Sequence, residues 1–175
     1  MFFGLFIEYF IVLQLNWLII LILFIGFLFL LFLGIIITTF GYNSKNVEVF
    51  RKQDVINAFI NKENQAIIWF FFPIIIIIEE LIFRYYSIGV LIQIIRLELV
   101  SAIFISSIVF SLFHFHVWFR YRNFTILLIN LVYPFLMGLY NGYILLNLGL
   151  FPCILVHYFI ALFLYYNIYK QYFKT

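Results

Sequence analysis

The chain has 175 residues, of which 67% are hydrophobic and only 10% are charged, and its mean hydropathy is +1.19. Soluble domains are about 45–50% apolar and about 25% charged, so a chain of this composition cannot cover a water-facing surface. This excludes a water-soluble globular enzyme and a nucleic-acid-binding module, and the single cysteine, Cys153, excludes an intramolecular disulfide scaffold. The net charge of +3 comes from ten basic residues, which is too sparse for a phosphate-binding face. We therefore predict an all-α, multi-pass membrane protein whose partner is the lipid bilayer.

A helix needs about 20 apolar residues to cross a bilayer core, and the sequence contains several runs of that length. The first, residues 15–40, carries no charge, and residues 2–14 before it are also largely apolar, so the N-terminal anchor is either one overlong helix or a hairpin. Residues 41–64 are the only polar stretch, and their apolar positions recur at helical spacing, which predicts an amphipathic helix on the membrane surface. Further spans are expected at residues 65–86, 99–119, 124–146 and 150–169, with a short interfacial turn at 87–98.

These segments predict one helical bundle of about five spans, or six if residues 2–40 form a hairpin. We divide the chain into an N-terminal anchor and connector, residues 1–64, and a core, residues 65–175. Lys and Arg are most frequent in the 41–64 loop, in the turn at 120–122 and in the C-terminal tail. Because short basic loops stay on the cytoplasmic side, this bias predicts a cell-membrane protein with its N-terminus outside and its C-terminus in the cytoplasm.

Two adjacent carboxylates, Glu79 and Glu80, lie deep in the expected second span. An ionised carboxylate inside a membrane helix costs about 2.5–3.5 kcal/mol on insertion scales, so each needs a partner. Arg84 is four residues beyond Glu80 on the same helix face, and these two can pair. Glu79 is rotated by about 100° and lacks that partner, which makes it a candidate general base. The alternatives are a buried ion-pair staple with Arg84 and a carboxylate pair that is solvated at the headgroup level.

Two other spans each carry a histidine, His114 and His157, well inside apolar sequence. Either could simply bond a neighbouring carbonyl, but one shared site explains three costly placements more economically. Glu79 and His114 could deprotonate a water while His157 stabilises the oxyanion, or Glu79, His114 and His157 could bind zinc. On a continuous helix His116 points about 160° away from His114, and we interpret it as an interfacial group. The sequence contains neither an HExxH zinc motif nor a serine nucleophile elbow.

Three motifs in this order resemble the CPBP family of type II CAAX prenyl endopeptidases and bacteriocin-processing and immunity proteins: Glu79-Glu80-x-x-x-Arg84, Phe110-x-x-x-His114 and a late His157. The resemblance covers about residues 66–165. It implies that Glu79 is the catalytic carboxylate, supported by Glu80 and Arg84. It further implies that His114 is the partner of Glu79 on a water or a metal and that His157 stabilises the oxyanion. Zinc and the absence of any cofactor are both compatible with the resemblance.

One position departs from the family pattern HxxxN, because Ala161 stands four residues after His157 where an asparagine is expected. Alanine donates no side-chain hydrogen bond, so one oxyanion donor is missing unless Asn141, Asn147 or Asn167 replaces it. The loss of such a donor typically lowers the rate by about 10²–10³. We predict an intramembrane endopeptidase that cleaves a peptide or small protein near the membrane surface. The alternatives are a non-catalytic protein of the same fold, acting in bacteriocin immunity or as a scaffold, and a small proton-coupled transporter.

Overall fold

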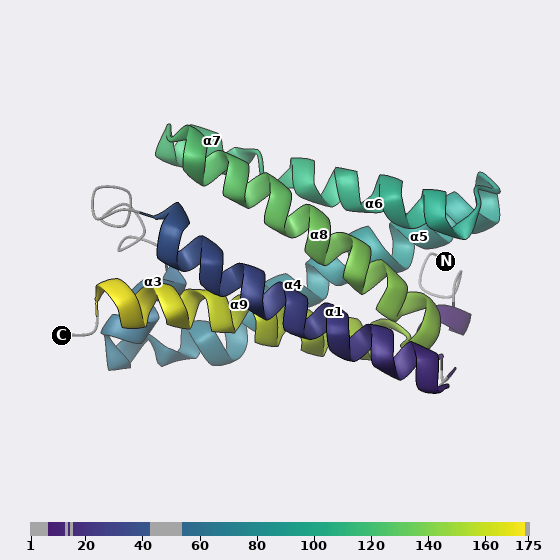
Figure 1. Ribbon diagram of the computed structural model, residues 1–175, viewed down its shortest axis with the longest axis horizontal. Coiled ribbons are helices and arrows are strands. Elements are labelled where there is room, and N and C mark those ends of the chain that lie inside the picture. Colours follow the sequence, from purple (N-terminus) through teal and green to yellow (C-terminus); the bar gives the residue numbers. More distant parts are fainter. Residues whose placement is uncertain (1–6, 13, 15, 43–53, 174–175) are drawn as a thin grey trace.

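The computed structural model describes residues 7–12, 14, 16–42 and 54–173, and within these ranges every regular element is a helix (Figure 1). The long helices are α1 (Trp17–Ile36), α6 (Leu99–Phe113), α8 (Phe124–Leu148) and α9 (Leu150–Tyr172), and the shorter ones are α3 (Asp54–Ile60), α4 (Phe72–Glu80), α5 (Ser87–Gly89) and α7 (His116–Tyr121). Among the described residues, four helical segments are long and apolar enough to cross a membrane: Trp17–Gly41, Leu99–Tyr121, Phe124–Leu148 and Leu150–Tyr172. The predicted all-α, multi-pass bundle is therefore confirmed.

The segment expected as the second span is helical but irregular. Three π-helical stretches, η4 (Ile67–Phe71), η5 (Leu81–Tyr86) and η6 (Val90–Ile94), alternate with α4 and α5. Such wide turns occur frequently at functional sites, and η5 begins directly after Glu80. The expected interfacial turn at 87–98 is wrong in its first part, because the helical run continues to Ile94. Ile88 is fully buried in a core cluster, so packing keeps this stretch helical until the chain bends at residues 95–98.

The described residues before α1 (7–12, 14 and 16), here called the N-terminal strap, run along the turn between α8 and α9. The backbone N–H groups of Val12 and Gln14 donate to the carbonyl oxygens of Leu148 (3.4 Å) and Asn147 (3.0 Å), which are left over at the end of α8. The described residues before α1 contain one 3₁₀ turn, η1 (Ile7–Tyr9), and no helix that could span a membrane. Within these residues, neither the overlong anchor helix nor the helical hairpin is present, because this backbone pairs with the α8–α9 turn instead.

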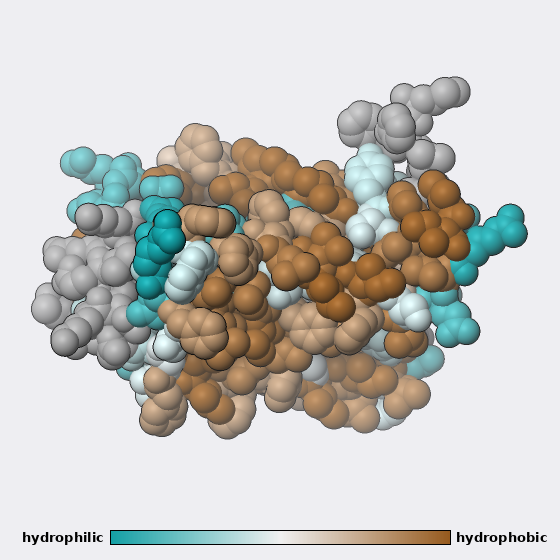
Figure 2. Space-filling view, turned by 90° about the horizontal axis from the view of Figure 1, so that it is seen from above, coloured by the Kyte–Doolittle hydropathy of each residue, from teal (hydrophilic) through white to brown (hydrophobic). Residues whose placement is uncertain are grey.

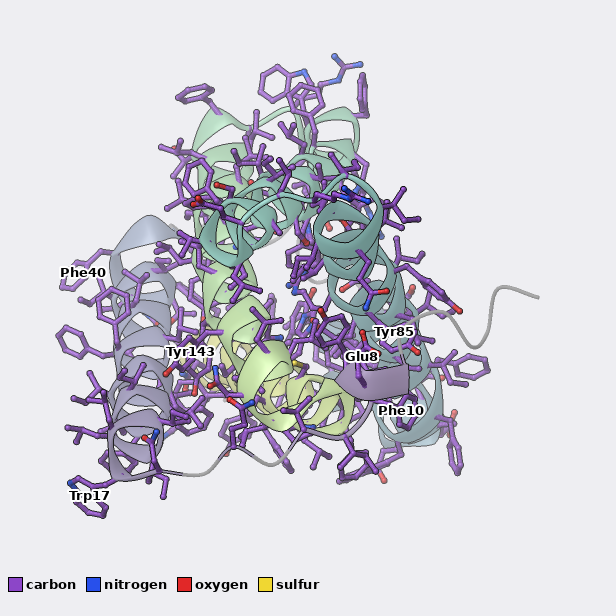
Figure 3. All side chains as sticks on the ribbon, turned by 90° about the vertical axis from the view of Figure 1, so that its right-hand side faces the viewer. Glu8, Phe10, Trp17, Phe40, Tyr85 and Tyr143 are labelled. Carbon is purple, nitrogen blue, oxygen red and sulfur yellow. The ribbon has the colours of Figure 1, made fainter. Side chains whose placement is uncertain are left out.

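The start of α1 and the strap are each held by specific contacts. Asn16 caps α1, because its side chain accepts a hydrogen bond from the backbone N–H of Ile19 (2.8 Å). Phe10 packs edge-on against the buried Tyr85, with ring centroids 6.2 Å apart (Figure 3). The strap therefore also covers η5, the stretch that follows Glu80.

Two tyrosines of α8 attach α1 to the bundle. The Tyr140 hydroxyl donates to the Leu23 carbonyl (2.6 Å), and the Tyr133 hydroxyl donates to the Leu30 carbonyl (3.1 Å). The two contacts are seven residues apart on each helix, and the later tyrosine meets the earlier leucine. Helices α1 and α8 are therefore antiparallel over two turns. Gly26 makes the approach possible, since a Cβ there would lie 2.6 Å from the Tyr140 ring. Because lipid offers phenol groups no hydrogen-bond partner, these contacts fix the position of α1.

Small residues bring α6 and α8 together. A Cβ at Gly138 would lie 2.9 Å from Cβ of Ser107, and a Cβ at Gly142 would lie 2.6 Å from Ile103. Small residues spaced by four allow such close helix contacts in membranes. The Ser111 hydroxyl adds a 2.6 Å hydrogen bond to the Leu131 carbonyl on α8. This packing fixes the end of α6, where the FxxxH motif lies.

The surface of the bundle is mainly apolar along its length, and hydrophilic side chains gather near both ends (Figure 2). Trp17 and Phe40 project outward from the first span and are 78% and 82% exposed (Figure 3). An apolar surface of this kind is suited to the hydrocarbon core of a membrane. The cell membrane as location, the orientation of the termini and the division into residues 1–64 and 65–175 stay predictions. Of the expected amphipathic segment at 41–64, residues 43–53 lie outside the described residues, and 54–60 form α3.

Candidate functional site

The carboxylate of Glu80, the last residue of α4, is fully buried in the site. The side chains of Glu80 and Arg84 are both 0% exposed, and Arg84 Nε lies 3.4 Å from Glu80 Oε2. Asn141 Nδ2 donates to Glu80 Oε1 at 3.0 Å, and His157 Nδ1 lies 2.6 Å from the same oxygen. A buried ion is costly unless charges and hydrogen bonds compensate it, and Glu80 receives both. The pairing of Glu80 with Arg84 that helical spacing predicts is present, with two partners added from α8 and α9.

His157 joins the two adjacent glutamates. Its Nδ1 faces Glu80, and its Nε2 lies 3.8 Å from Glu79 Oε2. Because an ionised carboxylate only accepts hydrogen bonds, we assign the Nδ1 proton to the bond with Glu80. In the neutral ring Nε2 then carries a lone pair on the side of Glu79. The Glu79 side chain is 16% exposed, so Glu79 is the more accessible of the two carboxylates.

Phe110 orients the two histidines and the arginine around one aromatic ring. The guanidinium carbon of Arg84 lies 4.0 Å from the ring centroid, as in a cation–π contact. The rings of His114 and His157 stand nearly perpendicular to it, with centroids 4.8 and 5.8 Å away. His114 Nδ1 also lies 2.9 Å from the Phe110 carbonyl oxygen, so Nδ1 carries a proton and the neutral ring presents Nε2 as an acceptor. The FxxxH spacing thus places both the ring and the backbone carbonyl of Phe110 beside His114, which lies one helical turn later.

Glu79, His114 and His157 line one cavity of about 580 Å³. They come from α4, from the end of α6 and from α9, so the cavity lies where these elements meet α8. Most of the other lining side chains are apolar, and polar ones include Arg120 and Asn130. The structure therefore brings together the three residues that the sequence analysis placed on separate spans. Their roles in a reaction stay predictions.

His116 also lines this cavity, contrary to the expected direction. Its ring centroid is 6.2 Å from that of His114, although the side chain is exposed as expected for an interfacial group. The reason is a break in the helix: α6 ends at Phe113, His114 is its C-cap and α7 begins at His116. An angle of about 100° per residue applies only within one helix and does not extend across this break.

Of the three asparagines considered as replacement donors, Asn141 alone contacts the described site network. Its amide donates to Glu80, and its Oδ1 has no hydrogen-bond partner among the described residues. Asn147 instead donates to the Tyr143 carbonyl (2.7 Å), and Asn167 Nδ2 is buried without a described partner. Ala161 lines the cavity, and Asn141 supports Glu80 rather than replacing a donor there. In the sequence, Asn141 is an amide side chain in the middle of an apolar span, and this is the signal that could have predicted its contact with a buried polar group.

Zinc would need three or more ligand side chains close to one point. The residue types of Glu79, His114 and His157 suit zinc, but among the described residues no group of three His, Cys, Asp or Glu side chains is arranged to hold a metal ion. The residues in their present arrangement do not fit a zinc site, so we derive no step through a metal. Cys153 is buried, and its thiol lies 3.2 Å from the Asn141 carbonyl and 3.4 Å from the Gly149 carbonyl, which suits a structural residue.

A comparison with protein families matches residues 62–163 to the family described as type II CAAX prenyl endopeptidase Rce1-like. The matched stretch is more than half of the chain and contains Glu79, Glu80, Arg84, His114 and His157. No curated protein and no solved structure matches the chain.

Proposed function

This chain belongs to the Rce1-like family of type II CAAX prenyl endopeptidases, and from that premise we propose that it hydrolyses a peptide bond inside the membrane with a water activated by Glu79. One observation carries the proposal: Glu79, His114 and His157 line one cavity, while the neighbouring Glu80 is occupied by structural partners. Two adjacent glutamates in different surroundings suit two different roles, one reactive and one supporting.

The reaction consumes one water and yields a carboxylic acid and an amine. The water lies between the Glu79 carboxylate and Nε2 of His114, and its oxygen attacks the peptide carbonyl carbon. Its proton passes to Glu79 while the electron pair of the carbonyl double bond moves onto oxygen. The carbon–nitrogen bond of the tetrahedral intermediate then breaks, and the leaving amine takes the proton from Glu79.

Glu80 acts through His157 rather than on the substrate. The carboxylate beside Nδ1 fixes the orientation of the ring, and when both ring nitrogens carry a proton, Nε2–H donates to the developing oxyanion. Arg84 and Asn141 hold the carboxylate in place at 3.4 and 3.0 Å. These three residues are therefore positioning residues for His157.

The substrate is a peptide or small protein whose cleaved segment enters the membrane-embedded cavity. The mostly apolar wall suits apolar side chains around the cleaved bond, and Arg120 and Asn130 offer polar contacts. A second candidate function, a non-catalytic member of the same fold in immunity or scaffolding, is favoured by Ala161. That residue lines the cavity but gives it no hydrogen-bond donor.

Cleavage of quenched fluorescent peptides by the full chain in proteoliposomes tests the proposal. The peptides carry apolar residues at the cleaved bond and are used with and without a prenyl group. Glu79→Gln is the inactive comparison, and Glu98→Gln is the matched control, because Glu98 is exposed and its side chain does not cap α6. We expect cleavage by the wild type and by Glu98→Gln but not by Glu79→Gln. A wild type no more active than Glu79→Gln would contradict the endopeptidase function and favour the non-catalytic one.

A further inference from the structure

The face of α9 that lines the cavity extends beyond Ala161 to Tyr165. His157, Ala161 and Tyr165 are spaced by four residues, so they follow one another along one face, and all three line the cavity. Side chains on an α-helix lean toward its N-terminus, so Tyr165 leans toward Ala161 and His157. A tyrosine side chain spans about one helical turn, roughly 5.4 Å. The hydroxyl of Tyr165 is therefore directed toward the level of the alanine one turn before it.

Phe72 of α4 holds the ring of Tyr165 from the opposite side. The two rings meet edge to face, with centroids 5.7 Å apart and an interplanar angle of 81°. Phe72 lies seven residues, or two turns, before Glu79, so both occupy the same face of α4. The contacts Phe72–Tyr165 and Glu80–His157 run in opposite directions along the chain, which makes α4 and α9 antiparallel. Glu79 and Tyr165 each lean toward the N-terminus of their own helix and therefore toward each other.

The hydroxyl of Tyr165 differs from four other tyrosine hydroxyls of the bundle that are bound to the backbone. It makes no hydrogen bond to the residues that the structure describes, and Glu79 and Arg120 line the same cavity. By contrast, four other tyrosine hydroxyls donate to backbone carbonyls: Tyr133, Tyr140, Tyr158 and Tyr172. Tyr165 is half-buried, and its hydroxyl lines the cavity without a described partner, so it is available to a ligand.

We propose that the Tyr165 hydroxyl donates to the carbonyl oxygen of the cleaved peptide bond and replaces the asparagine that the family pattern places at position 161. This inference rests on the proposed endopeptidase function. When water attacks, the carbonyl oxygen gains negative charge, and Tyr165 O–H donates a hydrogen bond to it without releasing its proton. His157 Nε2–H is the second donor. A donor one turn farther along α9, with a longer side chain, thus compensates for the short side chain of Ala161.

Tyr165→Phe is the direct test, because it removes the hydroxyl and keeps the ring against Phe72. We expect kcat to fall by about 10²-fold, the lower range for one oxyanion donor, with KM nearly unchanged. The matched control is Tyr169→Phe, one turn farther along α9. Tyr169 is not among the residues that line the cavity, and its ring stacks on Phe59 at 5.6 Å. This control should keep the kcat of the wild type.

Restoring the family residue gives a second readout that a purely structural tyrosine would not change. Adding Ala161→Asn to Tyr165→Phe should recover at least about tenfold of the lost kcat, because an amide then donates from the preceding turn. The same Ala161→Asn in the wild type should change kcat by less, since Tyr165 already supplies the hydrogen bond.

The role of Tyr165 and the endopeptidase function fail in different ways. If Glu79→Gln is inactive while Tyr165→Phe keeps the wild-type kcat, the assignment of Tyr165 is wrong and the endopeptidase function stands. If the wild type cleaves no better than Glu79→Gln, the endopeptidase function is wrong and the assignment of Tyr165 falls with it. If Tyr165→Phe loses kcat and Ala161→Asn recovers none of it, Tyr165 does not occupy the place of the missing asparagine.

Discussion

The same substitution at two adjacent positions, Glu79→Gln and Glu80→Gln, separates the reactive glutamate from the structural one. Glu80→Gln removes the charge that compensates the fully buried Arg84, whose Nη1 and Nη2 have no hydrogen-bond partner among the described residues. Glu79→Gln changes a partly exposed side chain of the cavity wall, which lies 3.8 Å from His157. We therefore expect Glu80→Gln to destabilise the fold strongly and Glu79→Gln to abolish activity with little loss of stability.

The size of the difference follows from burial. Removing one partner of a buried ion pair costs about 3–5 kcal/mol, whereas a solvated pair contributes about 0–1 kcal/mol. The free energies of unfolding of the two variants should then differ by at least about 2 kcal/mol. Since about 1.4 kcal/mol is tenfold in an equilibrium constant, the folded-to-unfolded ratio of Glu80→Gln should be lower by about 30-fold or more.

Reversible unfolding in mixed detergent micelles, followed by tryptophan fluorescence, measures these free energies. Glu98→Gln serves as the control for the loss of an exposed carboxylate and should lie within about 0.5 kcal/mol of the wild type. Equal destabilisation by Glu79→Gln and Glu80→Gln would refute the division of roles and would make both glutamates parts of one ion-pair staple with Arg84.

Three further predictions concern the metal, the packing and the aromatic centre of the site. Activity should survive exhaustive chelation, with no stoichiometric zinc found by metal analysis; activity that is lost on chelation and restored by zinc would contradict direct activation of water by Glu79. Gly138→Ala should lower the free energy of unfolding by about 1–3 kcal/mol, because its Cβ would lie 2.9 Å from Cβ of Ser107; unchanged stability would argue against this α6–α8 contact. Phe110→Leu should lower kcat about tenfold or more, because His114 and His157 lose the ring that orients them. The same kcat as in the control Phe104→Leu, whose side chain is exposed on α6, would contradict that role.

The sequence predicts best those parts of the fold that depend on local composition. The spans expected from 99, 124 and 150 begin at the first residues of α6, α8 and α9, and the span expected from 15 begins two residues before α1. Apolar runs define these helices, with a capping asparagine before α1 and α8 and a turn glycine before α9, and both signals can be read without tertiary contacts. The pairing of Glu80 with Arg84 belongs to the same class, because helical spacing alone brings these side chains together.

Contacts between distant segments could not be predicted in this way. Glu80 meets Asn141 and His157, which are 61 and 77 residues away in the chain. Helical periodicity shows which face a residue occupies but not which helix it faces. The pairing of the N-terminal strap with the α8–α9 turn is of the same kind. The direction of His116 was mispredicted for a local reason, since the helix breaks at His114 without a glycine or proline to indicate it.

The central claim is that Glu79 activates a water that cleaves a peptide bond within this cavity. Mass spectrometry of the products formed from a membrane-inserted peptide in heavy-oxygen water tests it most directly, with Glu79→Gln in parallel. We predict that the wild type forms one new carboxyl terminus that carries heavy oxygen and that Glu79→Gln forms none. No new carboxyl terminus with the wild type, or equal amounts with both proteins, would contradict the claim.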